Sequence, residues 1–308
     1  MGRFLFVMPE VASIVVPERV ETVPEKKVSP PKTIKSIETP PVETRSVEQP
    51  SAKLTEKVPK VLPAPQQPVA RNPQEKPLPL KKVGTLVFVF DDAGHNLAQL
   101  APFLDLPFPC TIAVLPGLRY SAESARRIRQ SGKDCILHQP MQAVNLSMDP
   151  GPGAVLQGMT ADQVRAVIRA NLDEIGPVTG MNNHEGSLIT ADRMAMSAVL
   201  DVIQERGLNF LDSRTTAETA VPALARERNI NILERAVFLD NSQDRDLIME
   251  AVYNGMKVAE RNGSAVMIGH IWSSDLAAIL TEMYPDLVSQ GFSLSTIARL
   301  ATLGDIDE

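Results

Sequence analysis

Short apolar runs alternate with amphipathic stretches along most of this chain, and that alternation limits the fold more than any other feature. Strands are predicted at 85–90, 110–115, 134–138, 177–183, 209–213, 236–241 and 265–270, and the C-terminal stretch FSLSTIARL offers an eighth β/α pair. Helices are predicted between them, near 96–104, 121–132, 160–176, 190–207, 218–228, 243–262 and 274–283. The runs are apolar on both faces, which is typical of a parallel sheet covered by helices.

The alternation predicts the α/β class, and a closed or partly open barrel is favoured over an open sheet. Polar residues follow nearly every predicted strand, and the carboxyl ends of barrel strands converge on one face. We therefore expect a distorted (β/α)7-8 barrel. Ser121, Thr160 and Thr190 are the expected N-caps of their helices, because a hydroxyl accepts from the first free backbone N–H groups.

Proline divides the chain into unequal parts. Residues 17–80 contain 14 of the 25 prolines, no glycine and no aromatic residue. Such a segment buries too little apolar surface to fold, so we predict a disordered Pro-rich linker over 17–82 and one folded domain over 83–308. Residues 1–16 are apolar, but the segment is too short to span a membrane and is interrupted by a proline and a glutamate. We interpret them as a degraded signal or anchor that could tether the domain to a membrane.

Charge follows the same division. Residues 17–82 carry 13 Lys/Arg and 8 Asp/Glu, a net charge of +5, whereas 83–308 carry 17 and 28, a net charge of −11. A domain this acidic repels nucleic acid, so no nucleic-acid partner is expected. Cys110 and Cys135 lie next to predicted neighbouring strands. A disulfide between them is geometrically feasible, and buried free thiols are the favoured interpretation.

Acidic residues and histidines recur at the ends of the predicted strands. Asp91 and Asp92 follow LVFVF, His138 ends CILH, His184 ends TGMNNH and His270 ends AVMIGH. If the strand ends converge, these side chains meet in one pocket although they lie far apart in the chain. Imidazoles and carboxylates gathered in one pocket are the ligands of a metal, and adjacent aspartates can divide the roles of ligand and base.

Simpler interpretations stay open for the individual residues. Asp91 or Asp92 can cap a helix that begins near His95, which is itself expected to be solvated on the first turn. A histidine such as His138, behind three apolar residues, can be a hydrogen-bonded core residue. Four histidines in equivalent places weaken that second interpretation.

Two more polar clusters follow predicted strands. Residues 182–187 suit a ligand-binding turn, or an Asn-rich turn that bonds its own backbone. Asp212 and Arg214 suit either a pocket or a structural ion pair. The chain contains no P-loop, no GxGxxG and no GxSxG, so a serine nucleophile is not expected.

Six ordered motifs, LVFVFDDAG, LHQPMQ, GMNNHEGS, NFLDSRT, VFLDN and MIGH, resemble those of the divergent polysaccharide deacetylase family. This family is a distant branch of the NodB-type carbohydrate esterases of bacterial envelopes, and the resemblance covers essentially all of 83–308. It implies a distorted barrel that holds a divalent metal, usually Zn²⁺.

The resemblance also assigns roles by position. Asp91 looks like the general base, and Asp92 looks like the carboxylate ligand of the metal. His138 and His184 look like the imidazole ligands, and His270 looks like the general acid that protonates the departing amine.

Further residues would shape the pocket or orient the ligands. The resemblance places Asn183, Asp212 and Arg214 in this group. The single Trp272, two residues after His270, suits a stacking platform for a sugar ring, and core packing is an equal alternative.

The chain also departs from the family pattern. Gln142 stands where an acidic residue is common, four places after the strand-end histidine, and Ile271 stands where proline is common. Glu185 and Leu188 are unusual within the Asn-Asn-His motif. Loss of a carboxylate near the metal is expected to weaken metal binding or change the preferred ion, and Glu185 is a candidate to compensate.

These features predict a metal-dependent hydrolase that removes N-acetyl groups from an envelope carbohydrate such as peptidoglycan or exopolysaccharide, located in the periplasm. The alternative from a different class is a glycan-binding or scaffold protein that keeps the barrel but cleaves weakly. A metal phosphoesterase is a third alternative, disfavoured because few basic residues lie near the motifs.

Overall fold

The computed structural model of this protein describes residues 82–304, so the predicted N-terminal segment and nearly all of the predicted linker lie outside the described residues. The strands are β1 Gly84–Ala93, β2 Thr111–Val114, β3 Asp134–Met141, β4 Gly180–Glu185, β5 Asn209–Asp212, β6 Leu233–Phe238, β7 Ser264–His270 and β8 Phe292–Ser295. The helices are α1 Leu97–Leu104, α2 Ser121–Gln130, α3 Ala161–Ile175, α4 Arg193–Arg206, α5 Val221–Arg228, α6 Arg245–Asn262, α7 Leu276–Ser289 and α8 Ile297–Gly304.

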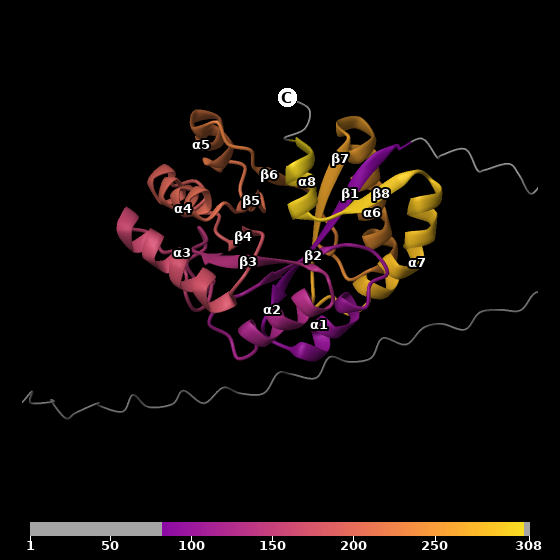
Figure 1. Ribbon diagram of the computed structural model, residues 1–308, viewed down its shortest axis with the longest axis horizontal. Helices are drawn as coiled ribbons and strands as arrows, with labels where there is room; N and C mark the ends of the chain where they lie inside the picture. The colour runs from indigo at the N-terminus through magenta and orange to yellow at the C-terminus, as the bar shows by residue number, and fades with distance from the viewer. Residues whose placement is uncertain (1–81, 305–308) are drawn as a thin grey trace, which may run out of the picture. The chain divides into compact units, whose positions relative to one another are not determined.

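Seven parallel strands form a closed ring. They follow the order β2-β3-β4-β5-β6-β7-β1, and an additional β1–β2 pairing closes the ring. The eighth strand is outside this ring, because β8 pairs with the beginning of β1, whereas β2 pairs with its end. Helices α1 to α7 lie around the outside of the strands (Figure 1). The expected distorted (β/α) barrel is confirmed.

Side chains of alternate strand residues form two separate apolar layers. Inside the ring, one cluster contains Val87, Val89, Ala113, Ile136, Leu211, Val266 and Ile268, together with Ile297 of α8. The larger cluster fills the space between the strands and the surrounding helices. Because strand side chains alternate with a period of two, this pattern fixes which residues face inward at each strand end.

Helix α8 closes the N-terminal end of the ring. Ile297 is buried among the inward-facing residues, and its backbone N–H donates to the Thr111 hydroxyl at 3.0 Å. Asp134, at the start of β3, accepts from the hydroxyls of Thr111 and Thr179 at 2.9 and 2.5 Å and from the Ala298 N–H at 3.3 Å. The polar groups of Thr111 and Asp134 at this end are therefore hydrogen-bonded within the protein. A functional site is expected at the opposite end.

Of the three expected helix caps, one is correct. Thr160 caps α3 in a full capping box with Gln163. Thr190 does not cap α4, because the Asp192 side chain accepts from the Met194 and Ala195 N–H groups at the start of the helix. The Thr190 hydroxyl donates to the Gly186 carbonyl instead. Ser121 does not cap α2 either, since its hydroxyl is directed back to the Leu115 carbonyl at 2.6 Å.

Two further expectations concern the cysteines and the membrane. Cys110 and Cys135 are free, and burial raises the pKa of each thiol to about 12, so both behave as inert core residues. Within residues 82–304, no helix is long and apolar enough to cross a bilayer.

Candidate metal centre and active site

The inward-facing positions at the C-terminal ends of the strands carry the polar residues. On β1 the inner residues Val87 and Val89 are followed by Asp91, and on β3 the inner residue Ile136 is followed by His138. The same alternation carries β7 from Ile268 to His270. The strand period therefore directs these groups inward at the same end of the ring, next to the apolar inner cluster.

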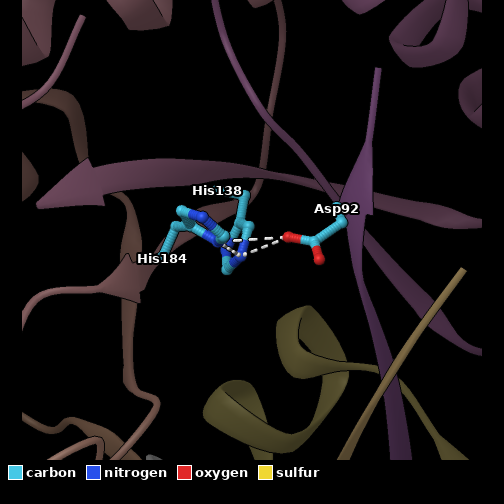
Figure 2. A group of neighbouring side chains, drawn as sticks. All are labelled: Asp92, His138 and His184. Carbon is cyan, nitrogen blue, oxygen red and sulfur yellow. Dashed lines mark hydrogen bonds and ion pairs between the residues drawn. The ribbon is translucent and has the colours of Figure 1, made fainter. Parts of the chain in front are cut away.

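Three side chains come together as a potential metal site. One ligand atom from each of Asp92, His138 and His184 lies within 4.8 Å of the other two. Asp92 Oδ1 is 3.1 Å from His184 Nδ1 and 3.3 Å from His138 Nε2, and the two imidazole nitrogens are 3.0 Å apart. Figure 2 shows the Asp92 carboxylate pointing across the site at the two rings.

Local backbone geometry lets two adjacent aspartates serve one site. Successive strand residues normally face opposite sides, so Asp92 would point away from Asp91. Asp92 instead has φ 69°, in the left-handed region that a residue with a side chain rarely adopts. Holding it there costs about 1 to 3 kcal/mol, which the surrounding structure must offset.

The donor set fits a divalent cation. Asp92 Oδ1 is buried and has no hydrogen-bond partner among the described residues, although buried polar atoms are normally paired. Burial alone would raise the pKa of Asp92, but His138 and His184 lower it well below its ordinary range. An ionised carboxylate oxygen opposite two imidazoles is a typical ligand set for Zn²⁺ or a similar ion.

Asn182 fixes the tautomer of one ligand. Its amide contacts both Asp91 carboxylate oxygens at 2.9 and 3.1 Å, and a carboxylate only accepts, so the NH₂ group must face Asp91. The amide oxygen then faces His138 Nδ1 at 2.7 Å, and that nitrogen must carry the proton. When the ring is neutral, His138 Nε2 carries the lone pair and directs it at the centre of the site, as a metal ligand requires.

Asp91 is held beside this centre as a buried carboxylate. It is 2% exposed, and Oδ2 lies 3.7 Å from His138 Nε2. Burial raises the pKa of Asp91 above its ordinary value, and the charges of His138 and His270 only partly oppose that effect. A carboxylate with a raised pKa is a stronger proton acceptor, which suits the role of a base.

His270 forms a dyad with Asp240. The Asp240 carboxylate accepts from the His270 backbone N–H at 2.7 Å and contacts Nδ1 of its ring at 2.9 Å. Burial by itself would lower the pKa of His270, but the hydrogen bond to Asp240 and the charge of Asp91 outweigh it and raise the pKa to about 9. The ring is therefore protonated at neutral pH and can donate a proton.

Three other predicted residues organise the loop after β5. Asn183 accepts from the Ser213 N–H at 2.9 Å. Asp212 accepts from the Arg214 N–H and from the Thr219 hydroxyl, each at 2.8 Å. The Arg214 side chain is 3.3 Å from Glu234. None of these side chains belongs to the Asp92–His138–His184 group in the described part of the chain.

Two residues that depart from the family pattern, Gln142 and Glu185, lie at the ends of the strands that carry His138 and His184. The Gln142 side-chain oxygen accepts from the Gln157 N–H at 2.8 Å, so it holds the loop after β3. Glu185 Oε2 is buried without a hydrogen-bond partner among residues 82–304, but Glu185 is not one of the three grouped ligands. His95 is exposed, as expected, but it precedes α1 and does not lie on its first turn, because Asn96 is the N-cap.

Sequence reasoning missed two residues that touch the site. Asn182 was treated as part of a turn, although it is the register partner of His138 and shares the inward phase of His184. Asp240 lies within the motif VFLDN, for which the sequence predicts no separate role. The signal for Asn182 was its spacing of two from His184, which places both on one side of β4.

Comparison with known proteins gives the family. Residues 88–301 match the model of the divergent polysaccharide deacetylase family. An uncharacterized Haemophilus influenzae protein is 31% identical over 194 residues, covering 63% of this chain and 69% of the relative. The Escherichia coli protein YibQ, also uncharacterized, is 32% identical over 188 residues, covering 61% of this chain and 58% of the relative.

A solved structure shows the same fold. The crystal structure of an uncharacterized Agrobacterium tumefaciens protein superposes with a TM-score of 0.68 at 20% identity, covering 71% of this chain and 90% of that chain. The family match spans most of the described barrel and contains every residue of the metal group. This chain belongs to the divergent polysaccharide deacetylase family.

Proposed function

We propose that this protein is a metal-dependent hydrolase that removes N-acetyl groups from an envelope carbohydrate. The observation that carries the proposal is the unpartnered, buried Asp92 Oδ1 facing the imidazoles of His138 and His184. A buried base, Asp91, and a protonated His270 flank that group. Hydrolysis of an amide needs a base for water and an acid for the departing amine, and both are present.

Asp92, His138 and His184 would hold the divalent ion, with Zn²⁺ the favoured candidate for this donor set. When bound, such an ion makes water easier to deprotonate and polarises a carbonyl oxygen. Asn182 keeps His138 in the tautomer that presents Nε2, so the ligand is oriented before the ion arrives.

Asp91 would accept the proton of the attacking water. Two contacts from the Asn182 amide fix its carboxylate. Asp91 lies on β1 directly beside His270 of the neighbouring strand β7. Water adds to the acetyl carbonyl carbon as this proton moves to Asp91. The carboxylate is already placed, so no side-chain reorganisation is needed at that moment.

His270 would then protonate the amine nitrogen as the C–N bond breaks. The products are acetate and the free amine of the sugar. Asp240 supports this role because it holds Nδ1 of the ring and stabilises the imidazolium form. A buried carboxylate that orients an imidazole and favours its charged form is a general device of acid catalysis.

The chemistry of the domain favours a glycan without phosphate as the substrate. Residues 83–308 carry a net charge of −11, which disfavours a phosphoester. An N-acetylated polymer such as peptidoglycan or exopolysaccharide is the substrate class that we propose, consistent with the description of the family. With that substrate class, we also propose that the protein is located in the bacterial cell envelope, in the periplasm.

Acetate release tests the proposal. The full chain, reconstituted with Zn²⁺, is incubated with N-acetylglucosamine oligomers and with peptidoglycan fragments. We expect acetate from the wild-type protein and from His95→Ala, whose histidine is exposed outside the site. Asp91→Asn should bind the metal and release acetate about 10²- to 10⁴-fold more slowly. Metal binding without acetate from any N-acetyl glycan would refute the proposal, and glycan binding that survives Asp91→Asn would then support the scaffold alternative.

A further inference from the structure

Trp272 lies at the junction of the metal group and the general acid. Its indole stacks on the His270 ring with centroids 4.9 Å apart and planes at 20°, and its Nε1–H donates to Asp92 Oδ2 at 2.8 Å. The side chain is 45% exposed, so the ring is not a core residue. One side chain therefore contacts both halves of the proposed machinery.

The turn after β7 builds this position. The Ile271 N–H donates to the Asp91 carbonyl at 3.1 Å, and the Ile271 side chain is buried. The Ser273 N–H returns to the His270 carbonyl at 3.1 Å, which closes the turn around Trp272. Backbone contacts on both sides of Trp272 thus bring its indole back over the site.

The two oxygens of Asp92 have different surroundings. Oδ2 accepts the indole N–H, whereas Oδ1 faces the two imidazoles and has no hydrogen-bond partner among the described residues. An indole N–H is a donor only, so it can hold a carboxylate but cannot compete for a cation. Its bond to an ionised oxygen is charge-assisted and stronger than a neutral one.

We propose that Trp272 is a positioning residue that restricts Asp92 to a single ligand oxygen, Oδ1. The inference rests on the proposed metal-dependent function. With the indole in place, Oδ2 is occupied and the carboxylate is fixed in orientation. Without it, Asp92 can rotate or present both oxygens, and the site loses part of its preorganisation.

Trp272→Phe isolates the hydrogen bond. Phenylalanine keeps an aromatic ring beside His270 and removes only the N–H donor. Tyr253→Phe is the matched control, because it also removes one polar group from a partly exposed aromatic residue, on α6 and away from the metal group. Both full-length proteins are titrated with Zn²⁺ and with Co²⁺ alone, without substrate.

We expect Trp272→Phe to bind either metal about 10- to 100-fold more weakly than the wild-type protein, as is typical when a partner of a ligand is removed. The visible absorption of the Co²⁺ form should also weaken, since release of Oδ2 allows a higher coordination number. Tyr253→Phe should match the wild-type protein in both measurements. Trp272 is the only tryptophan, so its fluorescence should change when the wild-type protein binds Zn²⁺.

The outcomes separate this inference from the proposed function. If the wild-type protein binds no metal, the proposed function fails. If it binds metal and Trp272→Phe binds equally well with the same Co²⁺ spectrum, only the positioning role is overturned. Circular dichroism monitors the folding of the variant. If Trp272→Phe does not fold, the wild-type fluorescence decides, and unchanged emission on saturation with Zn²⁺ overturns the inference.

Discussion

The two ends of the barrel each hold a carboxylate at a strand terminus, and the two are treated in opposite ways. At the N-terminal end, Asp134 accepts from two threonine hydroxyls and from the first turn of α8. At the C-terminal end, Asp92 has a left-handed backbone and an oxygen without a hydrogen-bond partner among the described residues. Both Asp134 oxygens have hydrogen-bond donors, whereas Asp92 directs a negatively charged oxygen at two imidazoles.

This contrast distinguishes a structural carboxylate from a functional one. A fully hydrogen-bonded group contributes to the fold and needs no ligand. A buried anionic oxygen without a donor is costly, and it persists where a cation or a substrate satisfies it. We therefore expect substitutions at the C-terminal end to change chemistry and metal binding, and substitutions at the N-terminal end to change stability.

The largest effect is expected from the base. Asp91→Asn should lower kcat for acetate release by about 10²- to 10⁴-fold, because an amide cannot accept the proton of water. The one side-chain oxygen that remains can still accept from the Asn182 NH₂ group, so His138 should keep its orientation and the variant should still bind the metal. Thr111→Val, at the other end of the barrel, is the control and should leave kcat unchanged. An equal loss of kcat in both variants would contradict the distinction between the two ends of the barrel.

The next effect concerns stabilisation by metal. At a Zn²⁺ concentration of about 100 times Kd, ligand binding stabilises the folded protein by about 2.7 kcal/mol, which corresponds to a rise in Tm of about 5 to 10 °C. Asp92→Asn should abolish this rise, because it removes the anionic ligand oxygen. Thermal unfolding with and without Zn²⁺ measures it, and a persistent rise in Asp92→Asn would contradict the ligand role.

The same experiment on Asp134 should give the opposite pattern. Asp134→Asn replaces one of the two acceptor oxygens by an NH₂ group, so either the Thr179 hydroxyl or the Thr111 hydroxyl and the Ala298 N–H lose their acceptor, which should cost about 1 to 3 kcal/mol of stability. Its rise in Tm with Zn²⁺ should equal that of the wild-type protein. A reduced metal response would show that the two ends are coupled.

The smallest effect is a shift in pH dependence. His270 must be protonated to act as an acid, and its pKa is raised to about 9, so activity should persist at neutral pH and fall as the pH rises through about 9. Asp240→Asn removes the anionic partner, so the pKa of His270 should fall towards its ordinary value of about 6.5. The basic limb of the pH–kcat profile should then move to lower pH. If the basic limb does not move, it reflects the titration of a group other than His270.

Much of this architecture follows from local sequence. The apolar runs predicted a strand at each position of the ring, although β6 lies three residues before the predicted 236–241, and the convergence of strand ends predicted that Asp91, His138 and His270 gather at one end. Helix caps were less certain, because Thr190 and Asp192 both offer a suitable oxygen and only the three-dimensional chain path selects Asp192. Composition and spacing carry no information on such a choice.

The contacts that set the chemistry depend on distant segments. The Trp272 N–H donates to Asp92 over a sequence separation of 180 residues, and the unusual φ of Asp92 lies at a break in the register between β1 and β2. Asn182 and Asn183 are adjacent and chemically identical. The predicted strand ended at 183, before His184, so the spacing of two that distinguishes Asn182 applies only once β4 is seen to extend to Glu185. The register of β4 against His138 decides it in favour of Asn182.

The central claim is that Asp92, His138 and His184 form a metal site, and metal stoichiometry tests it most directly. The full chain and its His184→Ala and His95→Ala variants are dialysed against Zn²⁺, and bound metal is counted per chain. We predict about one ion in the wild-type protein and in His95→Ala, and a loss of that ion in His184→Ala. No bound ion in the wild-type protein, or equal binding in all three, would contradict the account.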